Sequence, residues 1–401
     1  MSLKAISLFS GIGGLDYGFT AAGITTAVAV ERAKEPAATL AGHLQCPTII
    51  DDLARVSTRT LLRTAGVRKR HVDFLVAGPP CQPFSKAGMW NNAANRGIAD
   101  NRSETLNEFL RVMSGSLPRA ILFENVPGFA SRTHKEALEL LLGGINRINS
   151  RCKVSYNASY AILNAADYGV PQNRERFFLV AFRNGQEFKF PKPTHGEGRA
   201  KIRTAWDAIG NIQHGFEKSE LAVTGKWAKL LPSIPEGWNY LWHTSECGGL
   251  PLFGWRSRYW SFLLKLAKDR PAWTISAQPG GSTGPFHWDN RRLSIEELAR
   301  LQTFPKKLKL TSSRTNALKM IGNAVPSLLA EVLAREIISQ HFEPSTKSSR
   351  LKLSIPLQRP IPAATPPKPV PNAYRSLVGR HLPHPGTGRG PSPRLKISQS
   401  A

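Results

Sequence analysis

The chain is poor in cysteine and in acidic residues. Its 401 residues include four cysteines, and 28 Asp and Glu stand against 54 Lys and Arg. The cysteines have no paired or metal-ligand spacing, which excludes a disulfide framework, argues against a metal site and is typical of a reducing compartment. No apolar run approaches membrane-spanning length, and no charged-then-apolar signal segment opens the sequence. We therefore expect a soluble, cytoplasmic protein with no membrane partner and no metal.

The charge balance is strongly basic. The formal net charge is +26, and the sequence pI is about 10.4. So large an excess favours a polyanionic partner and salt-sensitive binding, because lysine and arginine displace the counterions of a phosphate backbone. The charge alone does not distinguish DNA from RNA.

A cysteine follows directly on a predicted buried strand. Residues 72–77 (VDFLVA) form the apolar run, and residues 78–85 (GPPCQPFS) end it with two prolines before Cys81. The carboxyl edge of an α/β sheet is where ligands bind, and a thiolate there acts as a nucleophile when nearby positive charge stabilises it. The alternative is a small buried core residue.

Two further strands carry polar residues at their ends. Residues 120–123 (AILF) lead to Glu124, while Arg174 and Arg176 precede the apolar run 177–182 (FFLVAF). A buried carboxyl group can hold or donate a proton to a ring nitrogen, and an arginine can clamp a carbonyl oxygen or a phosphate. A helix cap, a surface acid and solvated strand-end charges are the alternatives.

The N-terminal segment has the features of an adenosine site. Residues 5–9 predict a strand, residues 10–16 (SGIGGLD) a glycine turn into a helix, and residues 26–30 a second strand that ends in Glu31. An acid at that strand tip suits the two hydroxyls of a ribose. A dinucleotide turn would need glycine where this chain has Asp16, so the pattern argues against NAD. S-adenosylmethionine, which has no pyrophosphate, is the best candidate.

Six blocks together resemble the bacterial-type DNA (cytosine-5)-methyltransferase family. They follow the family's order and span residues 1 to about 342. The blocks are residues 9–14 (FSGIGG), 79–82 (PPCQ), 124–126 (ENV), 172–176 (QNRER), 291–305 (RRLSIEELARLQTFP) and 322–326 (GNAVP).

This resemblance implies a reaction and the residues that carry it. The Cys81 thiolate would add to C6 of a cytosine flipped out of duplex DNA, so that C5 attacks the methyl group of S-adenosylmethionine. Glu124 would engage N3 and the exocyclic amine of the base. Arg176, with Arg174 nearby, would hold the base carbonyl oxygen and help to keep the thiolate ionised.

The resemblance also implies a set of cofactor-binding residues. Leu106 is the weakest member of this set, because it also suits the core of a helix over residues 106–112. The implied residues are Phe9, Gly11, Gly13, Glu31, Asp52, Leu53, Pro80, Leu106 and Asn323.

The expected fold is α/β: a mainly parallel, Rossmann-like S-adenosylmethionine-dependent methyltransferase domain with a smaller target-recognition domain. We expect residues 1–182 to form the first part of the catalytic domain and residues 291–342 to return to it, with a helix over 295–302 that starts in a capping box. Residues 183–290, rich in tryptophan, glycine and proline, would form the target-recognition domain, with a strand over 272–277. Residues 343–401 contain twelve prolines, ten Lys or Arg and one acid, which predicts a disordered tail.

Two other functions remain open on the sequence. One branch of the family acts on transfer RNA, so an RNA cytosine-5 methyltransferase is the first alternative. A catalytically silent DNA-binding protein is the second, although intact Cys81, Glu124, Arg174 and Arg176 argue against it. The preferred hypothesis is a monomeric bacterial enzyme that acts on double-stranded DNA in a restriction-modification system, with a restriction endonuclease acting separately.

Overall fold

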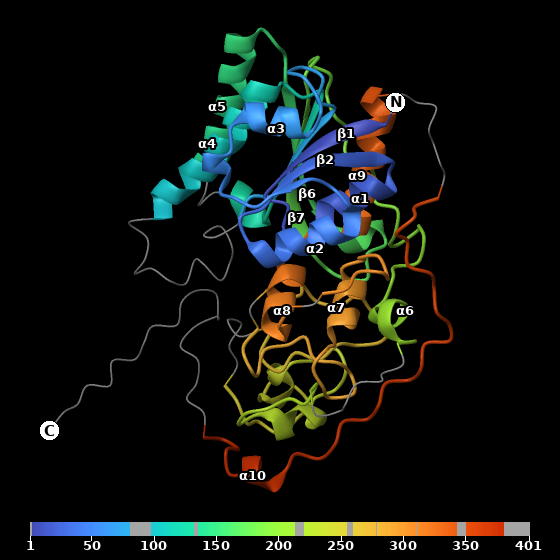
Figure 1. Ribbon diagram of the computed structural model, residues 1–401. Helices are drawn as coiled ribbons and strands as arrows, with labels where there is room; N and C mark the ends of the chain where they lie inside the picture. The colour runs from blue at the N-terminus through green and yellow to red at the C-terminus, as the bar shows by residue number, and fades with distance from the viewer. Residues whose placement is uncertain are drawn as a thin grey trace, which may run out of the picture.

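The computed structural model describes residues 2–80, 98–131, 135–212, 220–254, 260–277, 279–310, 312–342 and 350–380, without the side chains of residues 98–103. The molecule has two parts, a large unit and a small unit (Figure 1). The large unit comprises the described residues of 2–182 and 291–342. The small unit comprises those of 183–290. Helices α7 (Ile295–Leu301) and α8 (Arg314–Asn323) lie between the sheet and most of the small unit (Figure 1).

The large unit is built on a seven-stranded sheet of order β3-β2-β1-β4-β5-β7-β6. The neighbours from β3 to β5 pair in parallel, whereas β7 is antiparallel to both β5 and β6. The expected α/β fold with a mainly parallel sheet is confirmed. The strands are β1 (Leu3–Leu8), β2 (Ile24–Val30), β3 (Thr48–Ile49), β4 (Phe74–Ala77), β5 (Ala120–Asn125), β6 (Asn157–Asn164) and β7 (Glu175–Phe182).

Helices cover both faces of this sheet, so its central strands are continuous apolar runs rather than alternating ones. One apolar cluster joins the sheet to α1 (Gly14–Ala21) and α9 (Ser327–Ile337). A second cluster joins the opposite face to α3 (Thr58–Thr64), α4 (Ile98–Ser116) and α5 (Lys135–Cys152). Helix α2 (Lys34–Leu44) follows β2 at the edge of the large unit (Figure 1).

The two ends of the large unit meet where α1 packs against α9. A Cβ built on Gly14 would lie 2.4 Å from the carbonyl oxygen of Val325, and one on Gly18 would lie 2.4 Å from Cβ of Ala330. Only glycine allows this approach. The chain therefore builds the large unit from segments more than 300 residues apart.

We expect the substitution Gly14→Ala to destabilise the fold by about 1–3 kcal/mol, because the new methyl group meets rigid backbone. The measurement is urea unfolding followed by circular dichroism. Gly42→Ala, at an exposed position in the last turn of α2 with nothing within 4 Å of its Cβ, is the matched control. It should stabilise by up to about 1 kcal/mol. Equal effects of the two substitutions would contradict the packing described.

The segment Arg314–Phe342 is long and apolar enough to span a membrane by length and composition, but 78% of its most apolar window is buried inside the molecule. The apolar residues of this segment that lie in α9 instead pack into the core on one face of the sheet. It is therefore a core element of the large unit.

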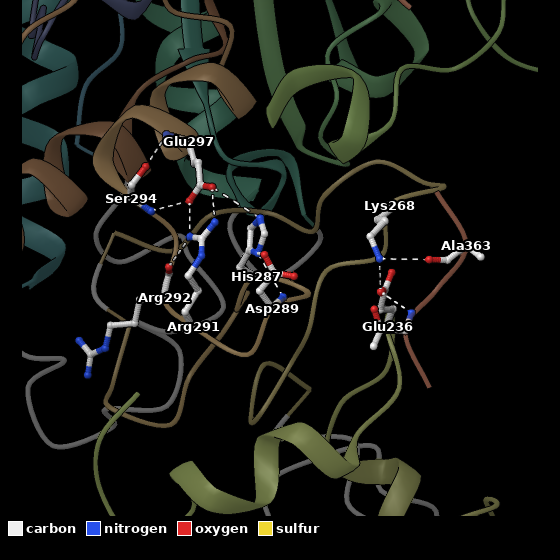
Figure 2. Close-up of polar contacts among 10 residues, drawn as sticks. Glu236, Lys268, His287, Asp289, Arg291, Arg292, Ser294, Glu297 and Ala363 are labelled. Atoms are coloured by element: carbon white, nitrogen blue, oxygen red, sulfur yellow. Dashed lines mark hydrogen bonds and ion pairs between the residues drawn. The ribbon is translucent and has the colours of Figure 1, made fainter. Parts of the chain in front are cut away.

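Helix α7 begins at the predicted capping box. Ser294 Oγ accepts from Glu297 N (3.1 Å), and Ser294 N donates to Glu297 Oε2 (2.7 Å). The fully buried Glu297 carboxylate also accepts hydrogen bonds from Arg291 Nη1 (2.9 Å) and Arg291 Nη2 (2.7 Å). His287 Nε2 lies 3.5 Å from Glu297 Oε1 (Figure 2). This carboxylate thus joins His287, near the end of the small unit, to Arg291 and to the start of α7.

The small unit is largely irregular. In its described residues the regular elements are α6 (Ala205–Ile209), η7 (Ala228–Ser233) and η8 (Tyr240–His243). An apolar core gathers around residues such as Leu231 and Tyr240, with Trp227 and Trp242 packed against it.

The prediction of a strand over residues 272–277 is wrong. Ala272 forms a single isolated bridge with Gln172, and the following residues have no ladder partner. Thr274 Oγ1 instead donates to Asn173 O (2.7 Å), and Ile275 N donates to Gln172 Oε1 (3.1 Å). The apolar residues that suggested a strand are buried because they brace the segment before β7.

The prediction of a disordered tail is wrong for residues 350–380. These residues run as an extended segment along the side of the molecule and end in α10 (Asn372–Arg375) beside the small unit (Figure 1). Val370 and Tyr374 join the core of the small unit. The segment buries no core of its own, but it is ordered because it uses partners on the rest of the chain. Residues 343–349 and 381–401 lie outside the described residues.

Candidate active site

Three segments of the chain meet at one edge of the sheet. Residues 78–80 follow β4, Glu124 lies near the end of β5, and Arg176 lies at the start of β7. Since β7 is antiparallel to β5, its first residues reach the edge where β4 and β5 end. Glu124 and Arg176, which the resemblance assigns to one base, thus lie at the same edge of the sheet.

Glu124 and Arg176 form a mostly buried ion pair. Arg176 Nε lies 3.1 Å from Glu124 Oε1, and the two side chains are 12% and 10% exposed, with Arg176 the larger. Burial raises the pKa of the Glu124 carboxyl above its ordinary value, although Arg176 and then Arg174 act in the opposite direction. The site therefore contains a carboxyl group that keeps its proton more readily than a surface glutamate does.

The loop that follows β4 lies directly against this carboxylate. A Cβ built on Gly78 would lie 3.3 Å from Glu124 Oε2. Asn125 Nδ2 donates to Pro79 O (3.4 Å), which ties the loop to the end of β5. Pro80 is exposed, and Cys81, the next residue, lies outside the described residues together with residues 82–97. The chain thus leads from the Glu124 carboxylate to Cys81 in three residues.

Arg174 is placed differently from its expected role. Its side chain is fully buried, with Nη1 donating to Ile275 O (3.2 Å) and Nη2 donating to Gly322 O (2.6 Å) and Ala324 O (2.9 Å). A guanidinium that binds three backbone carbonyl groups is not presented to a base. The structure therefore places Arg174 where it holds these segments together, close enough to Glu124 for its charge to act on that carboxyl.

Gln172 and Gln302 are two residues that the sequence reasoning missed. Gln172 Nε2 donates to Gln302 Oε1 (3.2 Å), and Gln302 Nε2 donates to Ile321 O (2.8 Å); both side chains are fully buried. They join the segment before β7, the end of α7 and the end of α8. Both glutamines stand inside blocks of the family resemblance, residues 172–176 and 291–305, and that position is the signal that the sequence offers for them.

The glycine turn and Glu31 lie together beside this edge. Gly11 N donates to Glu31 Oε2 (2.9 Å), and Ala33 N donates to Glu31 Oε1 (2.9 Å). Phe9, Gly11 and Gly13 all have positive φ, at 54°, 55° and 87°. A Cβ on Gly11 would meet nothing within 4 Å, so there is free space above the turn. A half-exposed carboxylate beside an open glycine turn fits an adenosine ligand.

The other predicted cofactor residues are distributed around this turn. Leu53 and Leu106 are buried in the cluster against which Phe9 packs, so Leu106 is at least a core residue. Asp52 is exposed and caps η1 (Leu53–Arg55) through Ala54 N (3.0 Å). Asn323 is exposed and is the last residue of α8. The next residue, Ala324, lies against Gly14 of α1.

Asp16, which excluded a dinucleotide turn, has a clear structural role. Its buried carboxylate accepts from Ser7 Oγ (3.1 Å) and Thr26 Oγ1 (2.9 Å) and so joins α1 to β1 and β2. Burial raises the pKa of Asp16, and these two hydrogen bonds oppose that rise. The residue fixes the start of α1 below the glycine turn.

Known proteins match this chain over most of its length. The family model for C-5 cytosine-specific DNA methylase matches residues 3–339. The Type II methyltransferase M.SacI of Streptomyces achromogenes is 36% identical over 371 residues, which covers 84% of this chain and 93% of that protein. The Type II methyltransferase M.AquIA of Picosynechococcus is 42% identical over 238 residues, covering 56% of this chain and 94% of that protein.

Solved structures share the fold at lower identity. A DNA modification methyltransferase encoded within an E. coli prophage is 21% identical, with a TM-score of 0.58 over 84% of this chain and 99% of that one. The Dnmt2 methyltransferase of S. pombe is 16% identical, with a TM-score of 0.57 over 85% of this chain and 99% of that one. At these identities the likeness establishes the α/β fold.

Proposed function

Because the chain belongs to the C-5 cytosine-specific DNA methylase family, we propose that it methylates C5 of a cytosine flipped out of one specific duplex sequence, with Cys81 as the nucleophile. The enzyme is a DNA (cytosine-5)-methyltransferase that uses S-adenosylmethionine. One observation supports these site assignments above all. The Glu124–Arg176 pair lies against the loop that leads to Cys81, at the sheet edge that also carries the open glycine turn.

The residues around the turn fit the cofactor. Glu31 would accept from the ribose hydroxyls, Gly11 and Gly13 leave room for the backbone to approach the ligand, and Phe9 with Leu53 would border the adenine. We assign Asp52, Pro80 and Asn323 to the rim of the same site, and Leu106 to its floor. When bound, S-adenosylmethionine supplies a methyl group on a positively charged sulfur.

The chain's own residues then make the base reactive. The Cys81 thiolate forms a bond to C6, and the electron pair of the C5–C6 bond becomes available at C5. Glu124 donates to N3 and accepts from the exocyclic amine, which stabilises the charge that develops in the ring. Arg176 both orients Glu124 and offers a positive charge to the base carbonyl oxygen. After methylation a base removes the C5 proton, and the C6–sulfur bond breaks to release Cys81.

The biological setting follows the curated relatives. Both relatives described above are named Type II methyltransferases, so we propose the same setting here: modification of DNA in the cytoplasm of a bacterium, with a restriction endonuclease as a separate partner. We propose that the enzyme acts as a monomer, because the described chain supplies both the Glu124 edge and the cofactor turn.

We expect Glu31→Gln to weaken S-adenosylmethionine binding by roughly ten- to a hundredfold, as expected for losing a hydrogen bond to a charged acceptor. Isothermal titration calorimetry of the DNA-free protein measures this. Glu35→Gln removes the same charge from a carboxylate that instead bonds Asn316 Nδ2 (2.9 Å), and it should leave the affinity unchanged. Equal affinities for both variants would remove Glu31 from the cofactor site.

The function itself is tested by transfer of radiolabelled methyl groups to duplex DNA and, separately, to transfer RNA. We expect label in duplex DNA, and sequencing of the product then gives the target site. Label in transfer RNA alone would support the RNA enzyme. DNA binding with no label in either substrate would support a silent DNA-binding protein.

A further inference from the structure

Residues 350–380 form what we call the strap. It lies beyond the family match, which ends at residue 339, and contains seven prolines and no acidic residue. The strap descends from the large unit along one side of the molecule to α10 at the far end of the small unit (Figure 1). It contacts both units through a series of buried acceptors.

The first anchor is Glu331 on α9 of the large unit. Its fully buried carboxylate accepts from Lys352 N (2.8 Å) and Leu353 N (2.9 Å) of the strap. Arg335 Nη2 also donates to it (2.7 Å), so the charge is balanced within α9. Leu351 and Leu353 pack against the apolar cluster that joins α9 to the sheet. The strap is thereby fixed to the large unit.

The second anchor is Asp207 on α6, which packs with α7 in a shared apolar cluster. The buried Asp207 carboxylate accepts from Gln358 N (2.7 Å) and Arg359 Nη1 (2.8 Å), and its backbone carbonyl accepts from Gln358 Nε2 (2.7 Å). Arg203 Nε donates to Ile355 O of the strap (2.6 Å). This anchor lies at the junction of the two units.

The third anchor is Glu236 in the small unit (Figure 2). Glu236 forms a buried ion pair with Lys268, and its carboxylate also accepts a hydrogen bond from Thr365 N of the strap (3.0 Å). Lys268 Nζ in turn donates to Ala363 O of the strap (3.4 Å). The strap backbone thus supplies a donor to the carboxylate and an acceptor to the ammonium group. These two hydrogen bonds supply the buried Glu236–Lys268 ion pair with polar partners in place of water.

The strap ends inside the core of the small unit. Tyr374 stacks on Trp227 with 5.7 Å between ring centroids, and its hydroxyl donates to Lys226 O (2.7 Å). Lys368 N donates to Pro232 O (2.9 Å), and Val370 is buried in the same cluster. Without the strap, this aromatic core would lose one of its members.

Three buried carboxylates therefore face one extended segment, and a buried carboxylate is costly unless it is bonded. The two units already share an apolar cluster around α6 and α7, and the strap adds bonded contacts to each unit on either side of that junction. We propose that the strap is a positioning element for methyl transfer: it fixes the small unit relative to the large unit, so that DNA held by both is presented to the Glu124 edge. Its prolines favour the extended conformation beforehand, which lowers the entropy lost on ordering.

The test uses the full chain with Thr365→Pro and Tyr374→Ala combined. Proline at 365 removes the N–H that reaches Glu236 but continues the extended Pro366-Pro367 stretch. If the competent arrangement falls to about a tenth of the population, KM for duplex DNA rises about tenfold. Turnover at saturating DNA and the affinity for S-adenosylmethionine should stay within about twofold. The matched control is Thr365→Ala with Tyr374→Phe, which keeps the N–H and the stacked ring and should behave as wild type.

A second measurement does not depend on methyl transfer. Spin labels on non-natural residues at Arg151 of α5 and Leu250 of the small unit report the distance between the units without DNA. We expect one narrow distribution in wild type and control, and a broader one in the test variant. Although the kinetic readout rests on the proposed function, these distances test the strap even if no substrate is methylated. An unchanged distance distribution in the test variant would overturn the proposal. So would a fall in turnover and in cofactor affinity that accompanies the rise in KM for DNA. Thr365→Pro alone gives the same test if the double variant does not fold.

Discussion

Cys81→Ala is expected to lower methyl transfer to duplex DNA by at least about 10⁴-fold, because without a thiolate at C6 the C5 carbon of cytosine is too weak a nucleophile. DNA binding and S-adenosylmethionine binding should remain within about threefold of wild type, since neither the basic surface nor the glycine turn changes. Single-turnover transfer with excess enzyme measures the chemical step, and filter binding and calorimetry measure the two affinities.

Cys152→Ser is the control for this experiment. Cys152 ends α5 and is half-buried, with its sulfur 3.7 Å from Ser114 Oγ, away from the Glu124 edge. The substitution Cys152→Ser removes one thiol from the protein but changes no residue of the proposed active site, so the methyl-transfer activity of this variant should match that of wild type. Substantial transfer by Cys81→Ala, or an equal loss in Cys152→Ser, would contradict the assignment of the nucleophile.

Glu124→Gln should lower the single-turnover rate by about 10²–10⁴-fold, the range typical of a lost general acid or base. The substitution keeps the size of the side chain and a hydrogen-bond donor, but it removes the titrating proton and the charge that faces Arg176. Glu139→Gln on the exposed face of α5, where Glu139 pairs with Lys135 at 2.9 Å, is the matched control and should leave the rate unchanged. A Glu124→Gln enzyme with wild-type rate would exclude this carboxyl from the mechanism.

The pH profile provides a sharper test of Glu124. Burial raises the pKa of its carboxyl, so the protonated form that donates to N3 persists to higher pH than in an exposed glutamate. As pH rises through this raised pKa the proton is lost, and kcat/KM should fall. In Glu124→Gln this falling limb should disappear, whereas Glu139→Gln should keep it. The same limb in both variants would assign the titration to another group.

The sheet and the reactive edge could be predicted because their signals are local. β4 and the start of β5 are unbroken apolar runs that lead to the loop before Cys81 and to Glu124, and parallel strands end at one edge of a sheet. The helix after Ser294 was predicted for the same reason, since its capping box lies within four residues. The roles of Cys81 and the cofactor residues remain predictions carried by the family motifs.

The features that the sequence did not reveal depend on partners that are distant in sequence. Arg174 and Arg176 are two residues apart, and only the fold shows that one meets Glu124 while the other binds the carbonyl groups of residues 275, 322 and 324. The strap was predicted to be disordered because its composition cannot form a core. Its order depends on Glu331, Asp207 and Glu236, which no property of the strap reveals.

Identification of the methylated nucleoside tests the central claim most directly. Duplex DNA incubated with the enzyme and S-adenosylmethionine is digested to nucleosides and separated by liquid chromatography with mass spectrometry. We expect 5-methyl-2′-deoxycytidine at one sequence, absent when the Cys81→Ala protein is used. A methyl group on the exocyclic amine of cytosine or adenine would contradict attack at C6 and the roles given to Cys81 and Glu124. A product found in RNA alone would contradict DNA as the substrate.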